Sequence, residues 1–341
     1  MSVSSDSGFQ TPATMPPPPP TPPVEPKGAR AFYLWPFAIG FFVLGLLFVV
    51  GSITKLTPGA WVTAIAFCFF GLLIFGLSFI RLPVVPKKTE EQPLSLFQKL
   101  TGIFFEPSRV FRNLREYPLW MGAFIIMGVL STAYGFAFVQ RITPERIVEQ
   151  QRRQMESMGA LGGTPEMREA RLSSELEVMK SPVQLATRTL VSFPFAFVLM
   201  VITAGLSMLG MLAFGGRMHF WQAVAVTIYA ALPVIVIQKV LGLVVLYLKS
   251  PEDLHPTLNR DTALQDNLGI LFSPADHPVL FVMASFIGLT SFYGLWLRAK
   301  GLHLGATRAG SGTGWGVAIT LWLLLLFLVV LLAVLFPASF Q

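Results

Sequence analysis

Long apolar stretches, separated by shorter polar segments, follow one another along the chain from residue 31 almost to its end. A helix that crosses a bilayer needs about 20 predominantly apolar residues. Seven stretches approach this length, at about 31–51, 59–80, 119–139, twice within 188–248, 279–297 and 315–336. The pattern therefore predicts an all-α integral membrane protein with about seven transmembrane helices.

The polar segments divide the chain into four parts. These are a tail (1–30), an N-terminal transmembrane hairpin (31–81), a linker with interfacial helices (82–117) and a five-helix membrane domain (118–341) with an insert at 140–187. The tail contains PPPPPTPP, which favours extended polyproline II and cannot form a core. We expect a disordered tail in preference to a ligand for a proline-recognising partner.

Two short amphipathic segments precede the membrane domain. Apolar residues of the segment LSLFQKLTGIFF fall close to one helical face, and a second apolar set with interspersed arginines follows Pro107. An apolar face beside arginines is typical of a helix that lies in the headgroup plane, although a soluble regulatory helix is the alternative. The apolar residues are Leu94, Leu96, Phe97, Leu100, Ile103, Phe104, Val110, Phe111 and Leu114, and the arginines are Arg109, Arg112 and Arg115.

The insert at 140–187 is predicted to form an extramembrane helical hairpin. The tripeptide TPE occurs at Thr143–Glu145 and at Thr164–Glu166, and a Thr cap followed by Pro and an acid is typical of a helix start. We expect helices at about 143–158 and 165–180. Their apolar stripe would dock or dimerise, or would pack against the membrane domain, which is the preferred interpretation. The stripe comprises Met155, Met158, Leu172, Leu176 and Met179.

The two apolar stretches within 188–248 meet at a tight turn, FGGRMHFW. Gly215 and Gly216 provide the backbone freedom that such a reversal requires. Trp221 follows the turn, and an aromatic residue at this place is typical of an anchor at headgroup level. Further along, Pro233 removes a helix hydrogen bond and favours a kink.

The same residues resemble the bacterial branch of the Yip family of multi-pass membrane proteins. The resemblance rests on the Gly-Gly turn, the pair Trp221-Gln222 and the pattern Tyr229…Leu232-Pro233. The stretches Gly102–Trp120 and Ser291–Leu302 are also similar, and together the likeness covers about residues 95–336. Some family members carry an acid two residues before Phe292, where this chain has Thr290.

This resemblance implies a five-helix membrane fold and a trafficking-like or membrane-organising role. Eukaryotic members of the family bind Rab-type GTPases. A bacterial member would lie in the inner membrane. The positive-inside rule, applied with the long insert discounted, favours a cytoplasmic N-terminus.

Composition excludes several classes of protein. The chain is 53% hydrophobic and 13% charged, and its net charge of +7 suits an anionic leaflet. No basic and aromatic stripe of the kind that binds nucleic acid is present in the sequence. Cys68 is the only cysteine, so neither an intramolecular disulfide nor a thiolate cluster is possible. The sequence contains no recognisable catalytic motif, and we expect a non-enzymatic protein without a cofactor.

A metal site is also not expected. The loop at 250–276 contains acids and histidines, but their spacing fits no known metal-binding loop. These residues are Asp253, His255, Asp261, Asp266, Asp276 and His277.

Lys239, beside Gln238, is the clearest charge within an apolar stretch. An ionisable residue inside a membrane is a functional hypothesis by default. A small-solute or lipid transporter would place Lys239, Gln238 and the Pro233 kink along its path, whereas an adaptor would need Lys239 only for snorkelling or pairing. The preferred hypothesis is a non-enzymatic adaptor or membrane-organising protein. Its partners are the lipid bilayer and a membrane protein or a second copy of the chain.

Overall fold

The computed structural model describes residues 30–54, 56, 60–82, 93–157, 164–256, 260, 263–274 and 276–336. These residues form helices and connecting turns, with β-structure limited to isolated bridges. The all-α prediction is therefore confirmed. The proline-rich tail at 1–29 lies outside the described residues.

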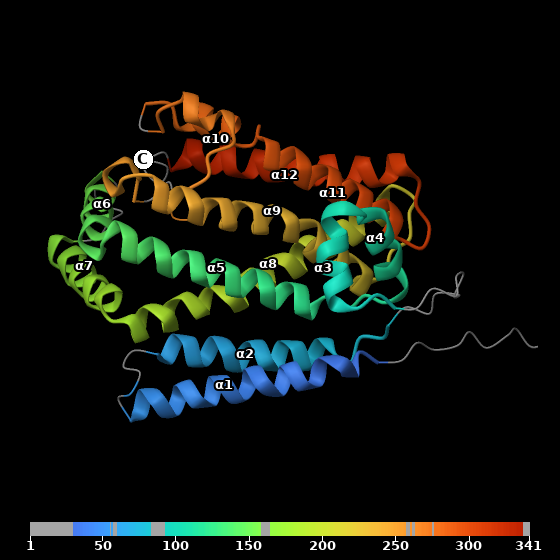
Figure 1. Ribbon diagram of the computed structural model, residues 1–341, viewed down its shortest axis with the longest axis horizontal. Helices are drawn as coiled ribbons and strands as arrows, with labels where there is room; N and C mark the ends of the chain where they lie inside the picture. The colour runs from blue at the N-terminus through green and yellow to red at the C-terminus, as the bar shows by residue number, and fades with distance from the viewer. Residues whose placement is uncertain are drawn as a thin grey trace, which may run out of the picture.

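Three long helices form the centre of the bundle, where they lie side by side (Figure 1). They are α5 (Met121–Ile142), α8 (Pro182–Ala213) and α9 (Phe220–Leu248). Each is predominantly apolar around its whole circumference, as expected for a helix that contacts both lipid and other helices. Helix α9 continues through Pro233 without interruption, so the expected kink does not break the helix.

A hairpin of α1 (Trp35–Ile53) and α2 (Trp61–Leu77) packs along one side of this centre, at the bottom of Figure 1. The short 3-10 helix η1 (Phe32–Leu34) precedes it. Phe70 of α2 lies in the main core, with ring contacts to Phe193 and Phe197 of α8. The predicted N-terminal hairpin is thus part of the bundle.

On the opposite side lie α10 (Pro278–Ser285), α11 (Leu289–Gly305) and α12 (Ser311–Leu335). The predicted single span at 279–297 is wrong, because the chain breaks between α10 and α11. Gly288 forms an isolated bridge with Asn267, and the Leu268 amide donates to the Ile287 carbonyl over 3.0 Å. A β-carbon at Gly288 would lie 3.0 Å from the Asp266 carbonyl oxygen, so this close approach needs glycine.

Five described helical stretches are long and apolar enough to cross a membrane. They are Phe32–Ile53, Met121–Ile142, Pro182–Ala213, Phe220–Leu248 and Ser311–Leu335. Helix α2 has 17 residues and falls just short of that length. The multi-pass architecture is therefore confirmed, whereas seven full-length spans are not found among the described helices.

Short helices cover the two ends of the bundle (Figure 1). Helices α3 (Leu96–Phe105) and α4 (Pro107–Glu116) lie at one end. Helices α6 (Pro144–Ser157) and α7 (Pro165–Lys180) lie at the other and match the predicted hairpin closely. Two 3-10 helices, η3 (Pro251–Asp253) and η4 (Leu268–Leu271), occur in the loop that follows α9.

The α6–α7 hairpin folds onto its own membrane domain. Leu172 and Met179 are buried, and Met155 and Leu176 pack against the same cluster, which also contains Tyr134 of α5. The preferred interpretation of the apolar stripe is confirmed for these four methionine and leucine residues. Met158 lies outside the described residues.

The structure corrects the predicted faces of α3 and α4. In α4, Val110, Phe111 and Leu114 are almost fully buried in the main protein core, so this apolar face does not lie in lipid. In α3, Phe97 and Phe105 are 73% and 84% exposed, whereas Lys99 is buried. Part of the predicted apolar face of α3 faces the protein, because Ile103 is buried and Leu94, Leu100 and Phe104 pack against the main core, whereas Phe97 points outward and Lys99 inward.

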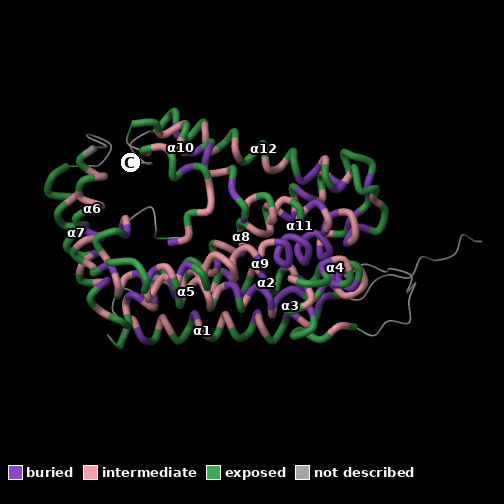
Figure 2. The backbone as a smooth tube through the Cα atoms, turned by 45° about the horizontal axis from the view of Figure 1, so that its top comes forward, coloured by how far each residue is buried: buried purple, intermediate pink, exposed green. Residues whose placement is uncertain are grey.

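Figure 2 shows that buried residues concentrate in the centre and that exposed residues line α1 and α12. Many of the exposed side chains on these helices are large and apolar, such as Leu47 (61%) and Phe327 (66%). Apolar surface of this extent requires a nonaqueous contact. The outer faces of α1 and α12 are thus suited to lipid.

Because Lys99 is buried, we expect the free energy of unfolding to depend on pH. Loss of hydration lowers the pKa of Lys99 from 10.5 to about 8. Between these two values the unfolded chain binds more protons than the folded chain, so the free energy of unfolding rises with pH across this window. We expect Lys99→Met to be more stable than wild type at pH 7, with a difference that shrinks between pH 8 and 10.5. Denaturation in detergent at a series of pH values measures this, and a constant difference would contradict it.

Candidate functional site

The turn between α8 and α9 uses its two glycines differently. Gly215 has a φ of +77°, a conformation that favours glycine. Gly216 instead permits close backbone contact, because a β-carbon there would lie 3.1 Å from both the Met211 and the Arg308 carbonyl oxygens. Both predicted glycines therefore serve the turn, but only Gly215 does so through its own φ angle.

This turn pairs with the segment that joins α11 to α12. The Arg217 amide donates to the Arg308 carbonyl over 2.7 Å, and the Arg217 carbonyl accepts from the Thr307 amide (2.9 Å) and hydroxyl (2.8 Å). Two helical hairpins are thus tied together at the end of the bundle that carries α3 and α4.

Trp221 is not a headgroup anchor, since its side chain is fully buried in the main core. Its ring stacks on Trp120 with centroids 6.1 Å apart, and Trp120 stacks on Phe197 at 5.1 Å. Its indole N–H donates to the Ile80 carbonyl over 3.2 Å. Gln222, also fully buried, donates from Nε2 to the Arg115 carbonyl over 2.7 Å. The predicted pair Trp221-Gln222 therefore fixes the start of α9 against α4, the start of α5 and the segment that follows α2.

Gln238 belongs to a polar contact between α9 and α11. Its Nε2 donates to the Thr290 hydroxyl over 3.1 Å, and the Thr290 amide donates to the Asp266 carboxylate over 2.7 Å. An acid at a helix N-terminus is favourable because it accepts from free amides. Asp266, from the preceding loop, therefore supplies the carboxylate that accepts from the first turn of α11, the turn that contains Thr290.

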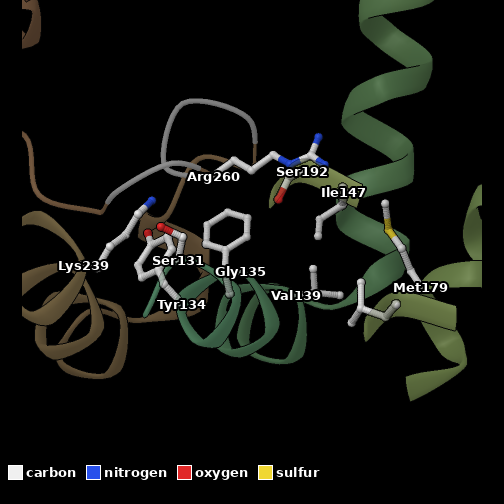
Figure 3. A pocket seen from close by; sticks show the side chains of 11 residues that line it. Ser131, Tyr134, Gly135, Val139, Ile147, Met179, Ser192, Lys239 and Arg260 are labelled. Atoms are coloured by element: carbon white, nitrogen blue, oxygen red, sulfur yellow. The ribbon is translucent and has the colours of Figure 1, made fainter. Parts of the chain in front are cut away.

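Lys239 lines a cavity of about 490 Å³ at the end of the bundle that carries α6 and α7 (Figure 3). Its Nζ lies 4.7 Å from the centroid of the Tyr134 ring, a cation–π contact. Arg260, from the loop after α9, contributes a second cation. The remaining lining residues are Ser131, Gly135, Phe138, Val139, Ile147, Met179, Leu185 and Ser192.

Three residues were predicted to lie along the path of a transporter, and only one of them lines this cavity. Lys239 lines it, whereas Gln238 bonds to α11, and Pro233 is buried in α9 away from the lining residues. Sequence reasoning missed Tyr134 and Arg260. The signal for Arg260 was its position as the single basic residue of an acidic loop.

The loop residues considered for a metal do not converge. Asp253 accepts from the Ser250 hydroxyl over 2.7 Å, and Asp266 binds the start of α11. Within the described residues no group of three or more His, Cys, Asp or Glu side chains is placed to hold a metal ion. Asp261 lies outside the described residues.

The apolar helices and their arrangement define a multi-pass α-helical membrane protein. Residues 101–333 match the Yip1 domain, which is more than half of the chain. The chain therefore belongs to the Yip1 family, and the predicted resemblance to the family is confirmed over these residues. The α1–α2 hairpin precedes the matched region, as expected. No curated protein and no solved structure matches the chain.

Proposed function

We propose that this protein is a non-enzymatic adaptor that organises partners at the membrane, with the α6–α7 hairpin as its docking surface. The supporting observation is that the hairpin is held firmly at one end of the bundle while its charged face points outward. Lys180 pairs with Glu145 over 2.9 Å and lowers the pKa of that carboxyl. The Arg146 guanidinium donates to the Pro251 carbonyl, and the Arg141 guanidinium donates to the Lys249 carbonyl over 3.3 Å.

The outward face carries both signs of charge. Arg153 and Glu169 have side chains that are 69% and 66% exposed. Exposed ion pairs contribute only about 0–1 kcal/mol to stability, so these charges are available to a partner at little cost to the fold. Complementary charges at an interface favour specificity and rapid association.

We also propose a bacterial inner-membrane location with a cytoplasmic N-terminus. The orientation is supported by the arginines at the end of the bundle from which α1 starts, with the α6–α7 insert discounted because its glutamates balance its basic residues. Arg115 and Gln222 connect α4 to α9 there, and Arg217 pairs with Arg308 at the same end. Basic residues are concentrated in cytoplasmic segments of membrane proteins. In this orientation the α6–α7 hairpin faces the periplasm.

Deleting residues 140–187 is a poor test of the adaptor, because the deletion would uncover Tyr134, Phe138 and Leu246 of the second core. A double variant, Arg153→Glu with Glu169→Lys, changes the charge pattern of the hairpin and keeps its net charge. The matched control, Glu106→Arg with Arg109→Glu, exchanges an exposed pair at the opposite end of the bundle. Extraction in native-lipid discs and mass spectrometry then identify what co-purifies.

We expect a stoichiometric partner, or a second copy of the chain, that is retained by the control and lost from the hairpin variant. Recovery of the protein alone from wild-type membranes would overturn the adaptor proposal. A partner retained equally by both variants would overturn the assignment of the docking surface.

A second candidate is a small-solute or lipid transporter. It is favoured by one observation, the position of Lys239 in a cavity between helices. Replacing Lys239 with Met would abolish transport but leave an adaptor folded and active, so the two candidates predict different outcomes for one variant.

A further inference from the structure

We propose that the outer face of α11 binds one anionic phospholipid, with Lys300 as the cation that holds the lipid phosphate. The site lies toward the end of the bundle that carries α3 and α4, where α11 finishes (Figure 1). The α6–α7 hairpin lies at the other end of the bundle. The inference is therefore independent of the adaptor proposal.

One face of α11 is left uncovered by the neighbouring helices. Gly294 and Gly301 pack against α9, and Ala299 is buried against α12. The remaining face exposes apolar side chains, among them Leu289 (80%) and Trp296 (37%). Helix residues that are separated by three, four, seven or eleven positions lie on one face. The face of α11 that contacts lipid therefore runs from Leu289 through Trp296 to residue 300.

Lys300 lies at the end of this face, beside two stacked aromatic rings. Its Nζ is 4.7 Å from the centroid of the Trp296 ring, and that ring stacks on Tyr293 with centroids 5.9 Å apart. The cation–π contact orients the lysine side chain, so less conformational freedom is lost when an anion binds. Within the described part of the chain, the Lys300 ammonium forms no hydrogen bond and no salt bridge. Its N–H donors therefore remain available to a ligand.

The charge around Lys300 favours an anion. Helix α11 packs on α9, α12 and α4. Helices α9 and α12 contain no Asp or Glu, and α4 contains three arginines against one acid, Glu116. Asp266 binds the amide of Thr290 at the start of α11, ten residues before Lys300 and about 15 Å away along the helix. The elements that surround this part of α11 therefore carry a net positive charge.

Residues outside the described part of the chain do not reverse this balance in sequence. The ranges 1–29 and 83–92 together contain three lysines and four acids, a net charge of 3 − 4 = −1. The two cations of α11, Arg298 and Lys300, and the excess of two arginines in α4 exceed it.

The position of Lys300 along α11 matches the level of a lipid phosphate. It lies five residues before Gly305, the last residue of α11, which is about 7.5 Å along the helix. A lysine at this depth reaches the interface with its long side chain, at the level where tryptophans also gather. The apolar face continues for about 16 Å from Lys300 to Leu289. A phospholipid can therefore place its phosphate at Lys300 and an acyl chain along this face, whereas free phosphate can use only the cation.

Lipid binding by the full-length protein in a non-ionic detergent tests the proposal. Native mass spectrometry and thermal unfolding are measured with phosphatidylglycerol, with phosphatidylcholine of the same acyl chains, and with inorganic phosphate. Phosphatidylcholine keeps the phosphate and the chains but has no net charge. We expect one phosphatidylglycerol molecule to remain bound and to raise the melting temperature. Neither effect is expected from phosphatidylcholine or inorganic phosphate at the same concentration.

Four variants locate the site. Lys300→Met is expected to weaken binding of phosphatidylglycerol roughly tenfold or more, the effect of losing one charge-assisted hydrogen bond, and Lys300→Arg to retain it. Trp296→Leu keeps the face apolar but removes the ring beside the ammonium, so we expect a loss of roughly threefold. Arg30→Met is the matched control, because Arg30 lies 5.5 Å from the centroid of the Phe79 ring near the same end of the bundle. It should bind the lipid as wild type does.

Absence of lipid from wild type, equal retention of phosphatidylcholine, or unchanged affinity in Lys300→Met would each overturn the proposal. An equal loss in Arg30→Met would show that only the total charge matters, and stabilisation by inorganic phosphate alone would show an anion site without a lipid; both results contradict it. Melting temperatures without lipid show whether a variant is folded, and Trp296→Leu keeps the test valid should Lys300→Met fail to fold. Failure of the adaptor proposal would appear only in the co-purification experiment, so the two results are separable.

Discussion

Trp221→Ala is expected to lower the free energy of unfolding by about 3–5 kcal/mol, the cost of truncating a fully buried large aromatic side chain. The indole stacks on Trp120, contacts Phe220 edge-on and donates a hydrogen bond to Ile80. Its removal leaves a cavity between α5 and α9 and an amide carbonyl without its donor. Equilibrium denaturation in mixed micelles, followed by circular dichroism, measures the loss.

Trp61→Ala is the control for this substitution. Trp61 is the first residue of α2 and its side chain is 48% exposed. A half-exposed tryptophan loses fewer packing contacts on truncation than one in a packed core. Equal destabilisation by the two substitutions would show that Trp221 is not part of the core.

Gly314→Ala is expected to lower the free energy of unfolding by about 1–3 kcal/mol, the typical cost of overpacking. A β-carbon on Gly314 would lie 2.5 Å from the Ala299 carbonyl oxygen and 3.0 Å from the His303 amide nitrogen, so α11 and α12 must separate. Backbone atoms cannot move aside as a flexible side chain does. The same denaturation experiment measures the effect.

Gly312→Ala provides a control in the same helix. A β-carbon at Gly312 meets no atom within 4 Å, and alanine favours a helix over glycine by up to about 1 kcal/mol. The two substitutions should therefore change stability in opposite directions. Destabilisation of similar size at both positions would argue against close packing of α11 on α12.

Much of the fold was predictable from the sequence because length and apolarity alone define a membrane helix. The α6–α7 hairpin was also predictable, since its capping signals are local. The Thr164 hydroxyl accepts from the Met167 amide over 3.3 Å, as the TPE motif indicates. At the first TPE the structure differs, because Thr143 ends α5 with a φ of +76°. Thr143 is therefore both the last residue of the α5 end and the residue before the first turn of α6.

The errors arose where a local pattern has two possible tertiary outcomes. A tryptophan at a helix start beside basic residues is compatible with lipid or with a core. The choice at Trp221 depends on Trp120 and Ile80, which lie far away in the sequence. The break before α11 likewise depends on the pairing of Gly288 with Asn267.

The candidate site could be predicted only in part for the same reason. Lys239 was recognisable because a charge in an apolar stretch is unusual. The cavity itself needs α5, α7 and α8 to be placed against α9, and no periodicity in the sequence reveals that placement. Arg260 and Tyr134 reach Lys239 through the fold alone.

The bond from the Trp221 indole to the Ile80 carbonyl bears on how this protein evolved. Ile80 precedes the family-matched region, whereas Trp221 lies within it. An ancestor that consisted of the domain alone would have had to satisfy that indole in some other way, and would have exposed to lipid the rings that now contact Phe70. The N-terminal extension therefore completes the interior of the matched domain. A fragment limited to residues 101–333 would lack Ile80, and the buried Trp221 indole would lose its hydrogen-bond acceptor.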